Sequence, residues 1–386
     1  MLEDMAGLSG RAGDKRDRAP SEAWRPQLDI DVDKGGFLVS SPRPAGDEPE
    51  QAELLAEFDL DPQNWIVTGL RRSKWQRYDG EWLEAYRVNL RPSHQRAELF
   101  DVERFEAEIK KWRPARSVKP TRGDLTALYC SGDTQWGKDA GDGSEGTLRR
   151  VKAGISESIA RHKELKGRGV GQIALPQLGD CIEGTVSQGG RIVGRLDLPL
   201  TAQVRVGRRV LMEWVKAFAP LTEKLLIPVI PGNHDETMRH VLTNPTDSWQ
   251  LEIVQQVIDA CKENPALYHV EAIFPESDNS TLAVNLSGTM VGMIHGHQSR
   301  DIPKWWSQQS LGRTPVGDVD VLLSAHYHHF LANQVGPNLW VQIPSMDGGS
   351  PWFRDRHGLD SPPGVVSLVV GDGYDPRRDL TVLAGK

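Results

Sequence analysis

The 386-residue chain carries a formal net charge of −7, from 46 basic and 53 acidic residues, and 38% of its residues are hydrophobic. This balance is typical of a globular protein with a substantial core, and it excludes general attraction to polyanions, so any contact with nucleic acid must be local. No apolar run approaches the roughly 20 residues that cross a bilayer, and the polar N-terminus lacks the apolar segment of a secretion signal. With three sparse cysteines that form no disulfide framework, we expect a cytoplasmic protein without membrane association.

The first third of the chain is expected to contain a loose segment followed by a small extension. Residues 1–50, rich in Gly, Pro, Asp, Arg and Ser, are predicted to be largely disordered or loose. Residues 51–120 predict a small α+β extension that contains a β-hairpin. Its expected elements are a helix over 51–58, strands over 65–70 and 82–90 around the turn Asp79-Gly80, and a helix over 101–112.

The hairpin interleaves basic and aromatic side chains, namely Arg71, Arg72, Lys74, Arg77 and Arg87 with Trp75, Tyr78, Trp82 and Tyr86. Such a surface can hold nucleic acid through phosphate contacts and stacking. The alternative is a solvated β face whose aromatic residues turn into a small core, and the composition favours this alternative.

Residues 121–386 alternate strands with helices, a pattern that predicts an α/β domain with α+β layering. The expected helices cover 148–166, 200–219 and 247–262. The expected strands cover 125–130, 172–178, 225–230, 281–286, 290–294, 319–323, 330–335, 339–343 and 365–370. Residues 301–313 form a polar insert that carries Trp305 and Trp306.

Five of these strands end in short runs of polar residues, at 131–137, 179–181, 232–235, 295–297 and 324–329. Carboxylate, amide and imidazole groups at several strand ends are what adjacent divalent cations require, because each ion needs several N or O ligands and one carboxylate can bridge two ions. Neighbouring glycines let the backbone turn sharply. Any one run is also explained as ordinary strand-end polarity, but all five in order predict a metal site.

This ordered set resembles the calcineurin-like metallophosphoesterase superfamily, whose pattern is Asp-Xaa-His, Gly-Asp, Gly-Asn-His-(Asp/Glu), His and Gly-His-Xaa-His. The resemblance covers about residues 125–343 and implies a four-layer αββα sandwich with an N-terminal extension. The core is similar to the superfamily's double-strand-break repair exonucleases, and the large extension resembles phage-encoded members.

The resemblance implies two metal sites and one catalytic histidine. The first ion would be held by Asp133, Gln135, Asp180 and His328, and the second by Asp180, Asn233, His295 and His326. His234, paired with Asp235, would protonate or stabilise the leaving group. By register, His295 is assigned as a ligand rather than His297, and His326 and His328 rather than His329.

Two positions depart from the superfamily pattern. Gln135 stands where the family usually has His, and its neutral oxygen favours weak binding, an oxygen-preferring ion such as Mn²⁺, or contact through water. Ala325 replaces a Gly, a small change that a strand end accepts.

The implied reaction is attack on phosphorus by a hydroxide that two divalent ions activate, Mn²⁺ being expected and Fe, Zn or Mg being alternatives. DNA is the expected substrate, because the hairpin and the tryptophan pair are suited to stacking bases, although that pair is equally explained as a hydrophobic plug. The alternatives are a phosphatase acting on a small molecule or phosphoprotein, and a binding module with a degenerate metal site. The oligomeric state stays open, a homodimer included.

Overall fold

The computed structural model describes residues 26–384 except 32–34, 47–48, 63, 93–108, 116–118, 188–189, 191, 194–195, 240–242, 277 and 350–360. The chain forms two compact units, residues 1–93 and residues 94–386, which we call the smaller and the larger unit. Among the described residues, the helices are all too short or too polar to cross a membrane. The helix expected over 101–112 falls mostly outside the described residues.

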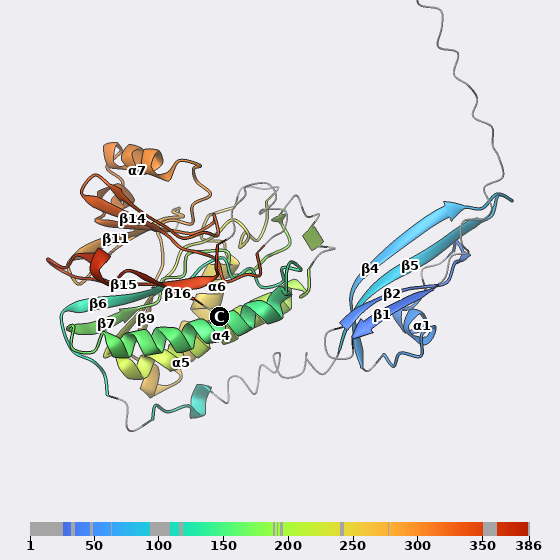
Figure 1. Ribbon diagram of the computed structural model, residues 1–386, viewed down its shortest axis with the longest axis horizontal. Helices are drawn as coiled ribbons and strands as arrows, with labels where there is room; N and C mark the ends of the chain where they lie inside the picture. The colour runs from blue at the N-terminus through green and yellow to red at the C-terminus, as the bar shows by residue number, and fades with distance from the viewer. Residues whose placement is uncertain are drawn as a thin grey trace, which may run out of the picture. The chain divides into compact units, whose positions relative to one another are not determined.

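The smaller unit is a five-stranded antiparallel sheet with one helix (Figure 1). Its strands are β1 (Gln27–Asp31), β2 (Gly35–Val39), β3 (Arg43–Pro44), β4 (Trp65–Gln76) and β5 (Trp82–Pro92), and its helix is α1 (Gln51–Ala56). Leu54 and Leu55 of α1 pack against Tyr86, Val88 and Leu90 of β5. The expected hairpin is present as β4 and β5, which are longer than predicted.

Strands β1, β2 and β3 lie inside the segment that the sequence predicted to be loose. Strands β2 and β3 both pair with β5, which is more than 35 residues further along the chain. Composition reports only local preference, so an order that depends on such distant pairing was not visible in residues 1–50.

The larger unit contains two sheets. The first has the strand order β16-β15-β6-β7-β8-β9 and the second the order β10-β11-β12-β14-β13. The first sheet is built from β6 (Leu125–Cys130), β7 (Val170–Ala174), β8 (Lys224–Pro228), β9 (Val270–Ile273), β15 (Gly364–Val370) and β16 (Thr381–Ala384). The second is built from β10 (Leu282–Leu286), β11 (Thr289–Met293), β12 (Val321–Ser324), β13 (Leu331–Val335) and β14 (Asn338–Gln342).

Four helices cover the outer faces of these sheets: α4 (Gly143–Glu164), α5 (Leu200–Phe218), α6 (Trp249–Lys262) and α7 (Ile302–Leu311). Short 3₁₀ helices cover Ala219–Leu221, Pro265–Leu267, Pro315–Asp318 and Pro376–Asp379. Helices α4 and α5 run along one face of the first sheet (Figure 1).

The layer order follows from the alternation of side chains along the strands. Ala127 and Tyr129 of β6 pack into the core formed with α4, α5 and α6, whereas Leu128 and Cys130 pack into the core shared with the second sheet. On β12, Leu323 faces that shared core, and Leu322 packs with α7. The order is therefore helices, sheet, sheet, helix, and the predicted αββα sandwich is confirmed.

Most of the insert at 301–313 forms helix α7. Asp301 caps α7, its Oδ1 accepting a hydrogen bond from the Lys304 N–H at 3.1 Å, and a proline occupies the first turn. Trp306 is only 2% exposed, and its Nε1–H donates to the Val316 carbonyl at 3.0 Å. Of the two roles considered for the tryptophan pair, base stacking and a hydrophobic plug, Trp306 has the second, because a buried indole cannot stack on a base.

Candidate metal centre

The predicted site residues lie in loops that follow the carboxyl ends of parallel strands. Strands β6, β7 and β8 are parallel neighbours in the first sheet, and β11 and β12 are parallel neighbours in the second. The loops also contact one another directly. The Asp133 N–H donates to the Gly179 carbonyl at 3.0 Å, and the His326 N–H donates to Asp133 Oδ2 at 2.8 Å. The edges of the two sheets therefore meet at Asp133.

Five of the predicted ligands have left-handed backbone conformations. The φ angles are 49° at Asp133, 42° at Gln135, 55° at Asp180, 69° at His326 and 57° at His328. Side-chain-bearing residues rarely adopt this region, and each costs on the order of 1–3 kcal/mol. Packing and hydrogen bonds from the surrounding loops must hold these residues, a strain that is concentrated at functional sites.

The loop after β8 lies directly against Asp180. A Cβ atom on Gly232 would be 2.1 Å from Asp180 Oδ1, and one on Gly179 would be 2.7 Å from the Gly232 Cα. Only glycine permits this approach. The His234 N–H also donates to Asp180 Oδ1 at 2.7 Å, so the backbone fixes this carboxylate.

One group of ligand atoms is ready to hold a cation. Asp180, His295 and His326 each offer a ligand atom within 4.8 Å of the others. His295 is fully buried with its Nδ1 at 2.7 Å from the Leu178 carbonyl and its Nε2 at 3.0 Å from Asp180 Oδ2, whereas His297 is exposed. This geometry agrees with the assignment of His295 by register.

Of the buried polar atoms in this region, five make no hydrogen bond to the described part of the chain: Glu183 Oε2 beside His234, and the four ligand atoms Asp133 Oδ1, Asp180 Oδ2, Asn233 Oδ1 and His295 Nε2. An unsatisfied buried polar group costs about 1–3 kcal/mol, and a bound cation removes that cost. All four belong to predicted ligands. The residues of the second predicted set therefore fit a divalent metal ion.

The electrostatic field at these atoms favours positive charge. Burial lowers the pKa of His295, but the charges of Asp180 and Asp133, together with the close contacts of the ring, outweigh burial and raise that pKa to about 9. Burial also opposes ionisation of Asp180, yet the neighbouring His295 and His234 hold the pKa of its carboxyl well below the usual range. A divalent cation is suited to this field.

The other predicted set, Asp133, Gln135, Asp180 and His328, is occupied differently. Gln135 Oε1 accepts a hydrogen bond from Lys138 Nζ at 2.7 Å, and Lys138 also forms an ion pair with Asp347. His328 lies between two carboxylates, with Nε2 3.4 Å from Asp133 Oδ1 and Nδ1 3.4 Å from Asp347 Oδ2. The structure thus adds a cation and an anion that the sequence analysis did not assign.

The expected pairing of His234 with Asp235 is replaced by another pairing. Asp235 Oδ2 accepts hydrogen bonds from the backbone N–H groups of Asp180 and Gly232, at 2.6 and 3.0 Å, so its carboxylate clamps two loops together. His234 Nδ1 instead lies 2.8 Å from Ser187 Oγ, 3.1 Å from the Glu183 carbonyl and 3.4 Å from Glu183 Oε2. Glu183 and Ser187 orient the imidazole.

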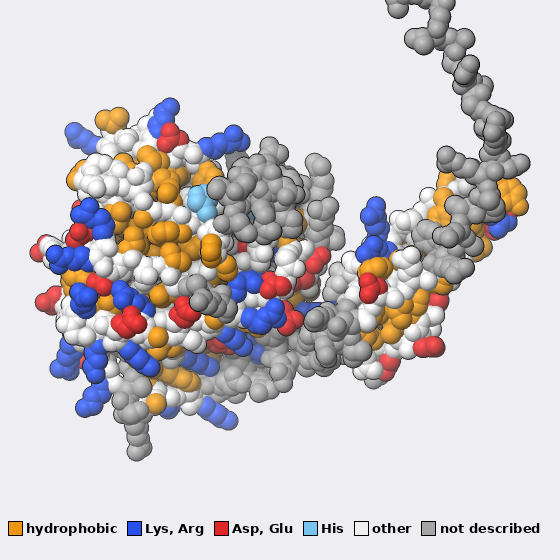
Figure 2. Space-filling model, in the orientation of Figure 1, with side chains coloured by type: hydrophobic (Ala, Val, Ile, Leu, Met, Phe, Trp, Pro, Cys, Tyr) orange, Lys and Arg blue, Asp and Glu red, His pale blue; other side chains and the backbone are white. Residues whose placement is uncertain are grey.

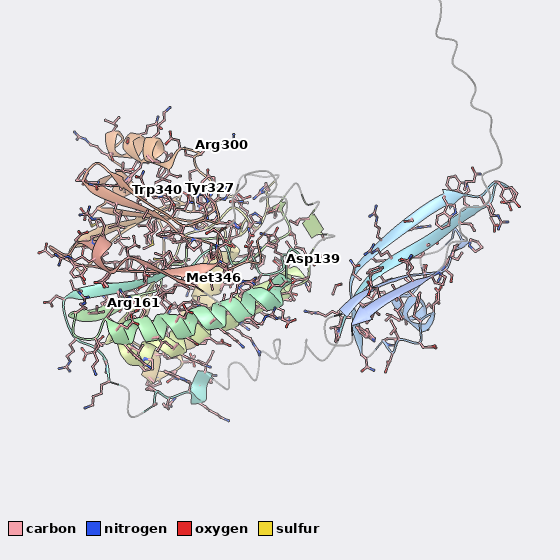
Figure 3. The ribbon with its side chains drawn as sticks, in the orientation of Figure 1. Asp139, Arg161, Arg300, Tyr327, Trp340 and Met346 are labelled. Atoms are coloured by element: carbon pink, nitrogen blue, oxygen red, sulfur yellow. The ribbon has the colours of Figure 1, made fainter. Side chains whose placement is uncertain are left out.

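Sequence reasoning missed Lys138, Glu183, Ser187 and Asp347. Lys138 and Glu183 each follow a predicted ligand by three residues, so they were within reach of the motifs. Asp347 follows β14, which is parallel to β12, so the strand-end rule applied to the other loops would have found it. Tyr327 and Met346, which are labelled in Figure 3, lie in the segments that follow β12 and β14.

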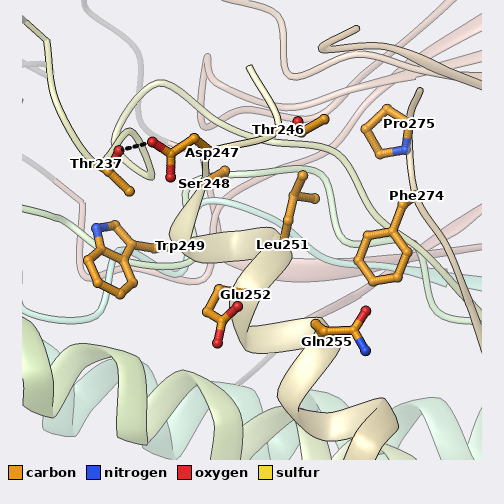
Figure 4. A pocket seen from close by; sticks show the side chains of 10 residues that line it. All are labelled: Thr237, Thr246, Asp247, Ser248, Trp249, Leu251, Glu252, Gln255, Phe274 and Pro275. Carbon is orange, nitrogen blue, oxygen red and sulfur yellow. Dashed lines mark hydrogen bonds between the residues drawn. The ribbon is translucent and has the colours of Figure 1, made fainter. Parts of the chain in front are cut away.

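A separate pocket of about 520 Å³ begins at Thr237, just beyond the loop after β8 (Figure 4). Its lining comes mainly from the first turns of α6, with Phe274 and Pro275 on the opposite side. Thr237 Oγ1 donates to Asp247 Oδ2 at 2.7 Å across its rim. The lining contains none of the predicted site residues, so we place the chemistry at the strand ends.

No family model matches the sequence, and no curated protein matches it. Solved structures similar to this chain include a conserved protein of Streptococcus pneumoniae described as a predicted phosphoesterase, with 12% identity, 67% of this chain and 87% of that chain covered, and a TM-score of 0.29. An archaeal protein described as a phosphodiesterase matches with 12% identity, coverage of 66% and 99%, and a TM-score of 0.30. Zinc-bound Vps29 from Entamoeba histolytica matches with 14% identity, coverage of 64% and 87%, and a TM-score of 0.29. At these TM-scores the likeness carries no argument, and the function rests on the site itself.

Proposed function

We propose that the chain is a metal-dependent phosphoester hydrolase. One observation carries this proposal: four buried ligand atoms, on strand-end loops of both sheets, lack hydrogen-bond partners among the described residues. A divalent ion held by Asp180, Asn233, His295 and His326 would polarise a phosphoryl oxygen and lower the pKa of a bound water. Mn²⁺ suits this mixture of oxygen and nitrogen donors, and Fe, Zn and Mg are the other candidates.

His234 is the proposed proton donor to the leaving oxygen. Burial lowers its pKa, but Asp180 and Glu183 together outweigh burial and raise that pKa to about 9 in the metal-free site. Its Nδ1 is held by Ser187 and Glu183, which leaves Nε2 free to meet the substrate. Nε2 lies 4.0 Å from Asp180 Oδ2, so the proton is beside the proposed ion.

The finer proposal is a phosphodiesterase that hydrolyses DNA, supported by the surface of the smaller unit. Arg71 of β4 lies directly opposite Arg87 of β5, and both side chains are exposed. The Arg87 guanidinium lies 3.9 Å from the centre of the Phe37 ring, and Trp82 is 49% exposed. Tyr86, in contrast, is buried in the core. Cations and one exposed indole on a hairpin suit phosphate contact and base stacking.

The test compares Mn²⁺-dependent hydrolysis of labelled single-stranded DNA, labelled double-stranded DNA, a bis-aryl phosphodiester and an aryl phosphomonoester. We expect hydrolysis of the diester and of DNA, abolished by chelation of the metal. Hydrolysis of the monoester alone would replace this proposal with a phosphatase. No hydrolysis, with well below one bound ion per chain, would instead identify a binding module with a degenerate site.

A further inference from the structure

We propose that the ammonium group of Lys138 takes the place of one of the two expected metal ions, so that each chain binds a single divalent ion. The inference rests on the proposed function, because it concerns the same centre. Lys138 Nζ lies 2.7 Å from Gln135 Oε1, the ligand position that departs from the superfamily pattern. The glutamine that stands in place of the usual histidine is thus the residue that this lysine hydrogen-bonds.

The contacts of Lys138 make it a fixed charge rather than a mobile surface cation. Its side chain is 19% exposed, and its ion-pair partner Asp347 is 3% exposed. Asp347 is held in turn by Ser345, whose Oγ–H donates to Asp347 Oδ1 at 2.5 Å. Asp347 also lies against His328 Nδ1 at 3.4 Å, so the lysine and a predicted ligand share one carboxylate.

A divalent ion in the first predicted set would have to displace these contacts. The amide oxygen of Gln135 is an uncharged metal ligand that already accepts a hydrogen bond from Lys138. The positive charge of Lys138 would also repel a metal ion at this position. The second set has no such competitor, since Asp180 Oδ2, Asn233 Oδ1 and His295 Nε2 make no hydrogen bond within the described structure, and the 3.0 Å contact of His295 Nε2 with Asp180 Oδ2 joins two members of the set itself. The first set therefore has a cation beside it and a ligand oxygen that is already hydrogen-bonded, whereas the second set has neither.

Asp133 then belongs with the single ion. Its Oδ2 accepts from the His326 N–H, and its buried Oδ1 makes no hydrogen bond to the described residues and lies 3.4 Å from His328 Nε2 and 3.9 Å from His295 Nε2. The single ion would take its ligands from Asp133 and the second set. Lys138 would supply a positive charge beside a phosphate bound at that ion, at the position where the superfamily resemblance implies a metal.

The test measures bound manganese per chain after equilibrium dialysis, by elemental analysis, together with the electron paramagnetic resonance signal of the bound ion. We expect about one ion per wild-type chain and the six-line signal of an isolated Mn²⁺. The Gln135→His/Lys138→Met double variant should approach two ions per chain and show spin coupling. Lys138→Arg, which keeps the charge, should stay at one ion, as should the control Lys152→Ala, a change at an exposed lysine of α4.

Two coupled ions per wild-type chain would overturn the inference and leave the proposed function standing. A double variant that folds, by circular dichroism, yet holds one ion would also overturn it, and the single Lys138→Gln variant serves if the double variant does not fold. Absence of bound manganese from every variant would overturn the proposed function as well.

Discussion

Asp180 connects the residues of the site. Its N–H donates to Asp235, its Oδ1 accepts from the His234 N–H, and its Oδ2 faces His295 Nε2. Removing this carboxylate would therefore disturb the proposed metal position and the proposed proton donor, His234, together. His162, which is also buried, has purely structural surroundings, with Nδ1 3.2 Å from the Tyr129 hydroxyl and Nε2 3.4 Å from Thr121 Oγ1.

His162 should make stability depend on pH. Burial lowers its pKa to about 4 from the ordinary 6.5, so the unfolded chain binds its proton more readily than the folded chain does. The stabilisation is complete above pH 6.5 and is lost as pH falls toward 4, by about 3 kcal/mol in total. Urea unfolding at pH 7.5 and pH 5 should show a smaller loss for His162→Gln than for the wild type. Equal losses would contradict the role of His162.

Glycines in the loops after β7 and β8 let these loops pack closely, which fixes the positions of the side chains in the site. Gly179, with φ of 87°, and Gly232 lie against each other and against Asp180. No side chain fits between these loops, so the distance between Asp180 and His234 is fixed by backbone contact. The strands themselves are short and buried and supply the rigid base.

Gly232→Ala should lower turnover by about 100-fold, because its Cβ would meet Asp180 Oδ1 at 2.1 Å and push the loop away from the ion. The measurement is turnover of the bis-aryl diester at saturating Mn²⁺. Gly46→Ala is the control, since a Cβ there meets no atom within 4 Å. An unchanged rate for Gly232→Ala would show that the loops are not held as tightly as we describe.

Among the helices and strands, the sequence predicted those that are determined by a local pattern of apolar residues. Strands β6, β7 and β8 were found as apolar runs, and the residues after them were predicted to be metal ligands. Strands β9 and β16, each of four residues, carry too short a pattern and were missed. The ion pair of Lys138 with Asp347 joins residues 209 positions apart, so it could not be predicted from a local sequence pattern. The partner of His234 is Glu183 and not the predicted Asp235, because the partner is determined by how the loops after β7 and β8 pack against each other.

The whole molecule combines a candidate metal centre in the larger unit with a hairpin in the smaller unit that exposes arginines. Acidic and basic side chains are both spread over the visible surface, as expected for a chain of net charge −7 (Figure 2). The proposed binding to DNA therefore requires a local patch, for which the exposed arginines of β4 and β5 are the candidates.

The Arg71→Glu/Arg87→Glu double variant should weaken DNA binding and leave hydrolysis of the bis-aryl diester unchanged. If each arginine contacts one phosphate, the slope of log affinity against log salt should decrease by about 2 in magnitude. Lys152→Glu serves as the control for an exposed charge elsewhere. An unchanged salt slope would remove the hairpin from the proposed DNA-binding surface.

The most direct test of metal-dependent hydrolysis is the turnover of the bis-aryl diester by Asp180→Asn and His234→Ala, with bound manganese measured in the same samples. We expect both variants to lose at least about 100-fold in turnover, since one loses a ligand and the other a proton donor. Asp180→Asn should also lose the metal, whereas His234→Ala should retain it at the wild-type level. Turnover that survives in Asp180→Asn, or metal loss in His234→Ala equal to that in Asp180→Asn, would contradict this assignment of roles.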